Sequence, residues 1–125
     1  MINDKCKMLN NKAENIQERC YTFALSIILA TRNFPRNSEG FVLSSQMVKA
    51  ASSIPANLFE GSGGVSKKEF IQFISLARKS AIEMMFWIRL VSDLCLISKD
   101  QHVKMLDEYD QIVRILSKII LNSKK

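Results

Sequence analysis

Basic side chains line the longest helix that this sequence predicts, at a spacing that suits contact with phosphate groups. Three of them, Lys67, Arg78 and Arg89, are eleven residues apart. A helix turns by about 100° per residue, so this spacing drifts only slowly around the helix axis. With neighbouring cations and one lysine of the preceding predicted helix, the candidate phosphate ligands are Lys49, Lys67, Lys68, Arg78, Lys79 and Arg89. Such contacts bind RNA or DNA through the backbone, with little sequence preference.

The alternative for these cations is a solvated surface with some ion pairing to Glu60, Glu69 and Glu83. For any single cation this alternative is favoured, because charged side chains are common on protein surfaces. For the six as a group, in an oligomer that repeats them, phosphate contact is favoured. Stacking on bases is not indicated, because Trp87 and most phenylalanines belong to apolar stripes.

The sequence offers no catalytic constellation. His102 is the single histidine and lies in an apolar seam, so a packing role is favoured over that of a general base. The Glu-x-x-His pattern of di-iron bundles is absent. Glu60, Glu69 and Glu83, without histidine, indicate a metal site only weakly. We therefore expect no enzyme activity, cofactor or metal, and an enzyme with a carboxylate-bound metal is the weakest alternative.

Four neighbouring residues form a candidate structural motif at the end of the second predicted helix: Pro55, Asn57, Glu60 and Gly61. A proline inside a helix removes a backbone hydrogen bond, and a glutamate at a helix C-terminus opposes the helix dipole. We expect Asn57 to satisfy backbone groups that a kink at Pro55 frees. We expect Glu60 to pair with Lys67 or Arg78 across the glycine turn.

Apolar residues recur in steps of three and four along four segments, which predicts helices at roughly 12–33, 45–60, 67–97 and 99–122. Ser44 or Ser45 is the expected cap of the second helix. The third and fourth helices each begin with a capping box, at Ser66 and Ser98. No strand, repeat or low-complexity segment is evident. The pattern predicts an all-α, up-down-up-down antiparallel four-helix bundle.

The third predicted helix is apolar on two faces. One face runs from Phe70 to Cys95 in unbroken steps of four and three, which suits the core of the bundle. The residues of the other face are Leu76, Phe86, Leu90 and Ile97. A small monomeric bundle buries only one face of a helix, so the second is expected to meet another subunit.

The length and composition of the chain fit one domain that covers residues 1–125. A hydrophobic fraction of 47% argues against disorder. The net charge of +6 and the pI of about 9.4 favour an anionic partner, with nucleic acid first, as strongly as they favour an inert basic surface. Cys6, Cys20 and Cys95 lack metal-site spacing and predict reduced thiols. Because no signal core or membrane span is evident, we expect a soluble, cytoplasmic protein.

The segment QMVKAASSIPANLFEG at 46–61, followed by SKKEFIQF at 66–73, ARKS at 77–80 and Glu83, resembles the four-helix-bundle family of 23S rRNA intervening-sequence proteins. The proline-asparagine-glutamate-glycine order followed by SKKEF is the specific part of the match. The helical pattern extends the resemblance over nearly the whole chain. This family includes relatives of the accessory variability determinant of diversity-generating retroelements.

The resemblance implies a four-helix bundle assembled as a ring, commonly a homopentamer, with a basic surface suited to nucleic acid. It also implies a reverse transcriptase and its template RNA as partners of the retroelement relatives. The sequence departs from the family pattern after Glu83, where residues 84–88, MMFWI, are bulkier and more apolar. This departure bears on the number of subunits and on the partner surface that the resemblance implies.

The sequence therefore predicts a non-enzymatic, oligomeric scaffold that binds RNA or DNA, with an accessory role beside a reverse transcriptase as one setting. The alternative is a protein-protein interaction module whose second apolar face binds a different polypeptide without direct contact to nucleic acid. Salt-dependent binding of nucleic acid by the purified protein would favour the first function. Instability without a co-expressed partner would favour the second.

Overall fold

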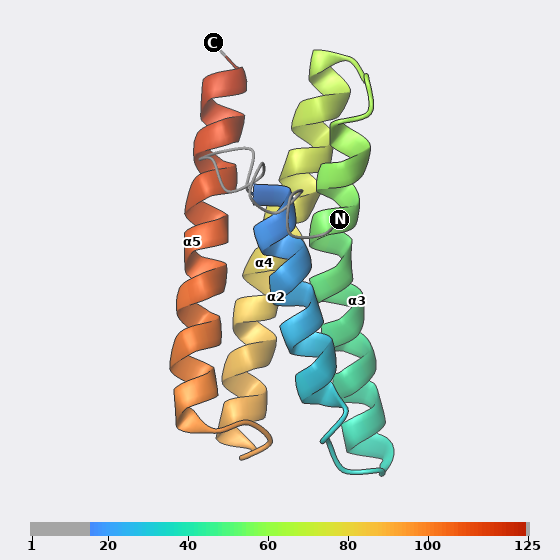
Figure 1. Cartoon of the computed structure of the whole chain (residues 1–125), viewed down its shortest axis with the longest axis vertical. Helices are drawn as coiled ribbons and strands as arrows, with labels where there is room; N and C mark the ends of the chain where they lie inside the picture. The colour runs from blue at the N-terminus through green and yellow to red at the C-terminus, as the bar shows by residue number, and fades with distance from the viewer. Residues whose placement is uncertain (1–15, 125) are drawn as a thin grey trace, which may run out of the picture.

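A computed structural model of the chain describes residues 16–124, and within that range all regular elements are α-helices. They are α2 (Ile16–Thr31), α3 (Ser38–Gly61), α4 (Lys67–Asp93) and α5 (Lys99–Ser123). The helices lie side by side along the long axis of the molecule (Figure 1). The predicted all-α class with four helices is confirmed for this range, and residues 12–15 of the first predicted helix lie outside it. None of these helices is long and apolar enough to cross a membrane.

The predicted apolar seams supply most of the core, but Cys95, predicted at the end of the core face of the third helix, is exposed. The largest fully buried side chains of the core come from all four helices and include Ile27, Met47, Ile54, Met84, Ile88, Tyr109, Ile112 and Leu116. α3 packs against both α2 and α4, and α4 packs against α5 as well. α2 contacts α5 only lightly and makes at most marginal contact with α4. α2 and α4 are therefore at diagonal corners of the bundle.

α3 begins at Ser38 rather than at residue 45, so the predicted start is wrong. The side chain of Asn37 is the cap, and its Oδ1 accepts a hydrogen bond from the backbone nitrogen of Gly40 at 2.8 Å. A Cβ atom at residue 40 would clash with the carbonyl oxygen of Pro35. Because glycine lacks that atom, the chain can turn tightly and start the helix earlier.

α4 ends at Asp93 rather than at residue 97. Cys95 has a positive φ of 61°, the left-handed conformation that usually follows a helix C-terminus. Its backbone nitrogen donates to the carbonyl of Ser92, and that of Leu96 donates to the carbonyl of Val91, both at 2.9 Å. This is a Schellman motif, and it was missed because the left-handed residue is a cysteine instead of a glycine.

Both predicted capping boxes are present. Ser66 Oγ accepts a hydrogen bond from the backbone nitrogen of Glu69 at 3.1 Å, and Ser98 Oγ accepts one from that of Gln101 at 3.0 Å. In each box the backbone nitrogen of the cap residue also donates a hydrogen bond, from Ser66 to Glu69 Oε1 and from Ser98 to Gln101 Oε1. These caps fix the starts of α4 and α5, and with them the positions of the cations along α4.

Candidate nucleic-acid interface

Five of the six predicted phosphate ligands lie on α4, and the sixth, Lys49, is exposed on α3. We call the five the α4 stripe: Lys67, Lys68, Arg78, Lys79 and Arg89. Four of them are exposed, and Arg78 is half-buried. At about 100° per residue, Lys67, Arg78 and Arg89 follow one edge of the helix, with Lys68 and Lys79 about a quarter-turn away.

Two carboxylates that the alternative interpretation pairs with cations of this stripe have other partners. The Glu69 carboxylate accepts hydrogen bonds from the backbone nitrogen and the hydroxyl of Ser66 at 3.3 and 3.0 Å. Glu83 Oε2 accepts a hydrogen bond from the indole nitrogen of Trp87 at 2.9 Å. Both acids thus stabilise local structure of α4, and neither forms an ion pair with a cation of the stripe in the described part of the chain.

The predicted pairing of Glu60 with Lys67 or Arg78 is wrong. The Glu60 side chain is exposed and forms no ion pair within residues 16–124. Arg78 is directed toward α5, where its Nε donates to Ser117 Oγ at 2.6 Å. An exposed pair gains little attraction in water and requires two long side chains to be held in place, so nothing draws these groups together.

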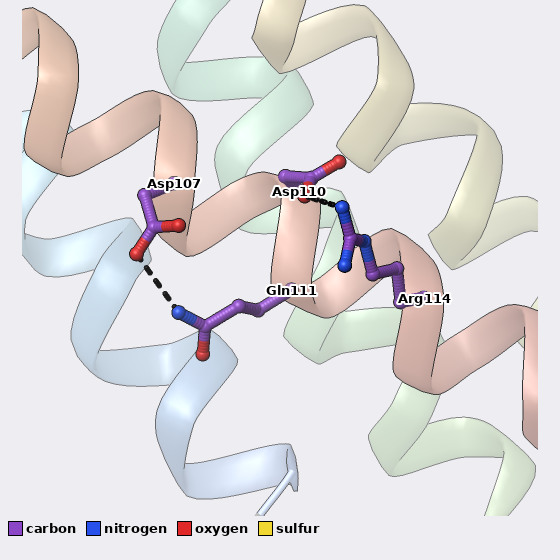
Figure 2. Close-up of polar contacts among 4 residues, drawn as sticks. All are labelled: Asp107, Asp110, Gln111 and Arg114. Carbon is purple, nitrogen blue, oxygen red and sulfur yellow. Dashed lines mark hydrogen bonds and ion pairs between the residues drawn. The ribbon is translucent and has the colours of Figure 1, made fainter.

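An ion pair does occur on α5, among residues of that helix. Arg114 Nη2 lies 2.9 Å from Asp110 Oδ2, and Gln111 Nε2 donates to Asp107 Oδ2 at 2.9 Å (Figure 2). Both contacts join residues four apart on the same helix. These two acidic groups of α5 are therefore satisfied along their own helix and leave the α4 stripe positive.

An open groove of about 320 Å³ lies between α4 and α5. The residues that line it are Ser75, Arg78, Ser117, Ile120, Leu121 and Lys124. It joins Arg78 of the predicted set to a cation and two hydroxyls that the sequence analysis missed. The groove depends on the register between two helices, and no local pattern in the sequence reveals that register.

The residues of the structural motif lie within one continuous helix, since α3 runs through Pro55. Pro55 has no backbone N–H, which leaves the carbonyl of Ala51 without its helical partner. Asn57 Nδ2 donates to the carbonyl oxygen of Ser53 at 2.7 Å. Asn57 therefore bonds to the backbone beside the interruption, although not to the carbonyl that Pro55 frees.

Small residues allow α3 and α4 to approach closely. Ser53 Oγ donates to Ser80 Oγ at 2.6 Å between the two helices. Gly61 is buried, and a Cβ atom there would lie 3.2 Å from the Cβ of Phe73. Gly61 thus has a packing role at the end of α3, next to the start of the α4 stripe.

The second apolar face of α4 is present on the surface. Leu76 is 49% exposed, Phe86 is 59% exposed and Leu90 is half-buried. The assignment of Ile97 to this face is wrong, because its side chain is only 8% exposed and belongs to the core. The helix has already ended at Asp93 and the chain has reversed, so the seven-residue repeat no longer applies.

Lys79 lies within this apolar face. Leu76, Lys79, Glu83, Phe86 and Leu90 follow each other in steps of three and four, as along a coiled-coil seam. We call these five residues the α4 seam. A subunit or partner packed on the seam would cover Lys79, so phosphate contact there competes with protein contact.

α2 carries an exposed apolar stripe that the sequence analysis missed. Tyr21, Leu25 and Leu29 recur every four residues, and about half of each side chain is exposed. We call them the α2 stripe. The four-residue spacing was available in the sequence, but the stronger seam through Cys20 and Ile27 on the other side of the helix obscured it.

The buried groups that ionise lie elsewhere, between α2 and α5. Burial raises the pKa of the Cys20 thiol to about 12 and raises the pKa of the Tyr109 hydroxyl well above its ordinary value of 10.0. Tyr109 Oη forms no hydrogen bond within the described structure. In residues 16–124, no cluster of three histidine, cysteine, aspartate or glutamate side chains is arranged to hold a metal ion.

Comparisons with known proteins agree with the four-helix architecture. A solved structure from Bacteroides thetaiotaomicron, described as a protein of unknown function from the S23 ribosomal protein family, is 26% identical with a TM-score of 0.77. The similarity covers 84% of this chain and 94% of that one. A comparison with curated proteins found no match. A sequence model of 23S rRNA-intervening sequence proteins matches residues 12–118, and the chain therefore belongs to that family.

Proposed function

We propose that the protein is a non-enzymatic, oligomeric scaffold that binds RNA or DNA through backbone phosphates. The observation that carries this proposal is the uncompensated charge of the α4 stripe, whose nearby acids Glu69 and Glu83 are engaged with a helix cap and an indole. A net charge of +6 adds long-range attraction for a polyanion. Cations spread along a rod-shaped helix suit a backbone that carries one charge per nucleotide.

Oligomerisation is part of the proposal because one subunit presents few cations. We infer an up-down-up-down antiparallel bundle, which the short connections and the alternating direction of the colours along successive helices support (Figure 1). The α4 seam and the α2 stripe lie on diagonal helices, hence on opposite sides of the subunit. Contact between two different patches is heterologous and closes into a ring when the rotation permits. The family resemblance supplies five as the number of subunits.

The test compares two triple variants with equal loss of charge. One replaces Lys67, Lys68 and Arg78 by alanine, and the control replaces the exposed α5 lysines Lys99, Lys104 and Lys118. Anisotropy of labelled oligouridylate and of labelled duplex DNA reports binding. The stripe variant should lose most of its affinity for both, because phosphate contacts are insensitive to sequence. Equal losses in the two variants would show that net charge alone binds, and would refute the assignment to the stripe.

A second candidate function is a protein-interaction module that binds a different polypeptide on the α4 seam. The observation that favours it is the exposed Phe86, whose ring packs edge-on against Trp87 at a centroid distance of 4.9 Å. Aromatic residues of this kind often anchor protein interfaces. The resemblance to retroelement accessory proteins suggests a reverse transcriptase as the partner. Co-purification that Phe86→Glu abolishes, with no binding of nucleic acid by the protein alone, would support this function over the first.

A further inference from the structure

The groove between α4 and α5 contains polar side chains that together suit a specific ligand. We propose that it is a site for one phosphate group, to which the two terminal nitrogens of the Arg78 guanidinium donate hydrogen bonds. The inference rests on the proposed function, since the phosphate is taken to belong to a nucleic-acid backbone. It goes beyond that function in naming the site, its geometry and three polar residues outside the predicted set, Ser75, Ser117 and Lys124.

The orientation of Arg78 is fixed from α5. Its Nε donates to Ser117 Oγ at 2.6 Å, and Ser117 Oγ donates its own proton to the carbonyl oxygen of Val113 at 2.7 Å. The serine hydroxyl is thus locked in the direction that accepts from arginine. A guanidinium has five N–H donors, so four donors on the two terminal nitrogens remain for a ligand. Ser117 acts as a positioning residue.

Within the described residues, the free donors of Arg78 have no protein acceptor. No carboxylate lies within ion-pair distance, and the bond to Ser117 is its one hydrogen bond in that range. A half-buried guanidinium with four unused donors favours an anionic ligand that offers two oxygens in one plane. Phosphate does so, and the arginine fork matches it with two parallel hydrogen bonds.

The other lining residues complete a site for a phosphodiester. The Ser75 hydroxyl forms no hydrogen bond within the described chain and is free to donate to a third oxygen. The exposed Lys124 adds a second positive charge at the groove. Ile120 and Leu121 give the groove an apolar wall, which suits the sugar beside a backbone phosphate.

The first experiment detects Arg78 directly. Side-chain ¹⁵N spectra of the arginines are recorded while either inorganic phosphate or oligouridylate is added. The Arg78 signals should shift and saturate with both probes, and at far lower concentration with the oligomer. The signals of Arg89, which belongs to the same stripe but lies outside the groove, should move little with inorganic phosphate. If the signals of the two arginines shift equally with inorganic phosphate, the groove does not bind phosphate selectively and the inference is overturned.

The second experiment uses conservative variants that keep the charge. Arg78→Lys should weaken oligouridylate binding about tenfold, because a lysine cannot form the paired bonds. The control Arg114→Lys, at an exposed arginine of α5 outside both the stripe and the groove, should change it little. Ser117→Ala should weaken binding and alter the Arg78 Nε signal, and Ser117→Thr should restore both because it keeps the hydroxyl. Ser75→Ala should also weaken oligouridylate binding. Because Ser75 is exposed, misfolding would not explain this loss of affinity.

The outcomes separate the two proposals. Strong, salt-sensitive binding of oligouridylate with equal effects of Arg78→Lys and Arg114→Lys would refute the groove and leave the proposed function intact. No binding of oligouridylate by the parent would refute the proposed function. In that case a selective response of Arg78 to inorganic phosphate would assign the groove to free phosphate, and the absence of a response would overturn the site entirely.

Discussion

At the scale of single residues, burial separates two cysteines that the sequence does not distinguish. Burial raises the pKa of Cys20 to about 12, so its thiol stays protonated at neutral pH, while Cys95 is exposed at the end of α4. The thiolate is the form that reacts with alkylating agents. We predict that iodoacetamide labels Cys95 in the native protein at pH 8 and labels Cys20 only after unfolding, as peptide mass mapping would report. Equal labelling rates in the native state would contradict the burial of Cys20.

Tyr109 presents a polar atom that the core does not satisfy. Its side chain is 1% exposed, and its Oη lacks a hydrogen-bond partner among the described residues. A buried unsatisfied hydroxyl costs about 1–3 kcal/mol, and removal of the oxygen leaves only a small space. Tyr109→Phe should therefore raise the free energy of unfolding by about 1 kcal/mol in urea denaturation. A loss of stability would mean that the hydroxyl has a partner in the intact protein.

At the scale of the helices, Asn57 stabilises α3 beside Pro55. Its amide donates to the carbonyl of Ser53 at 2.7 Å and is half-buried. Asn57→Ala should lower the free energy of unfolding by about 1 kcal/mol, the usual net value of such a bond. Helix propensity alone would change stability in the opposite direction, because alanine is a better helix former than asparagine, so a measured loss reports the hydrogen bond. If Asn57→Ala melts like the parent, the bond contributes nothing and the residue has another role.

Helix positions were predictable where the signals are local. The two capping boxes and the apolar seams predicted where the helices lie, because each pattern depends on residues three or four apart. The start of α3 and the end of α4 were not predictable from such patterns. Asn37 acts as a cap only because Gly40 lets the chain pass Pro35, and Cys95 adopts a conformation that glycine normally supplies.

The candidate site was predictable only as a set of cations. The eleven-residue spacing placed Lys67, Arg78 and Arg89 on one edge of α4. It could not reveal that Ser117, far along the chain, would orient Arg78, because that contact depends on the register of α4 against α5. Nor could it reveal that Lys79 shares the apolar seam.

At the scale of the whole molecule, the exposed α4 seam and α2 stripe predict a homo-oligomer. Phe86→Glu should dissociate it, because the seam would lose an apolar side chain worth about 1.5–3 kcal/mol and gain a buried charge. Light scattering after gel filtration measures the mass. Lys118→Glu, an exposed charge change on α5, should leave the mass unchanged. A monomeric mass for the parent would refute assembly through these faces.

The central claim is that cations of the α4 stripe bind backbone phosphates of nucleic acid. The most direct measurement is the slope of log affinity against log salt, taken between about 50 and 200 mM, where each phosphate contact contributes about −0.7 to −0.9. The parent should give a steep negative slope with unrelated RNA and DNA. The variant with alanine at Lys67, Lys68 and Arg78 should retain its helicity and give a slope that is flatter by about 2 to 3. An unchanged slope in this variant, or no binding by the parent at low salt, would contradict the claim.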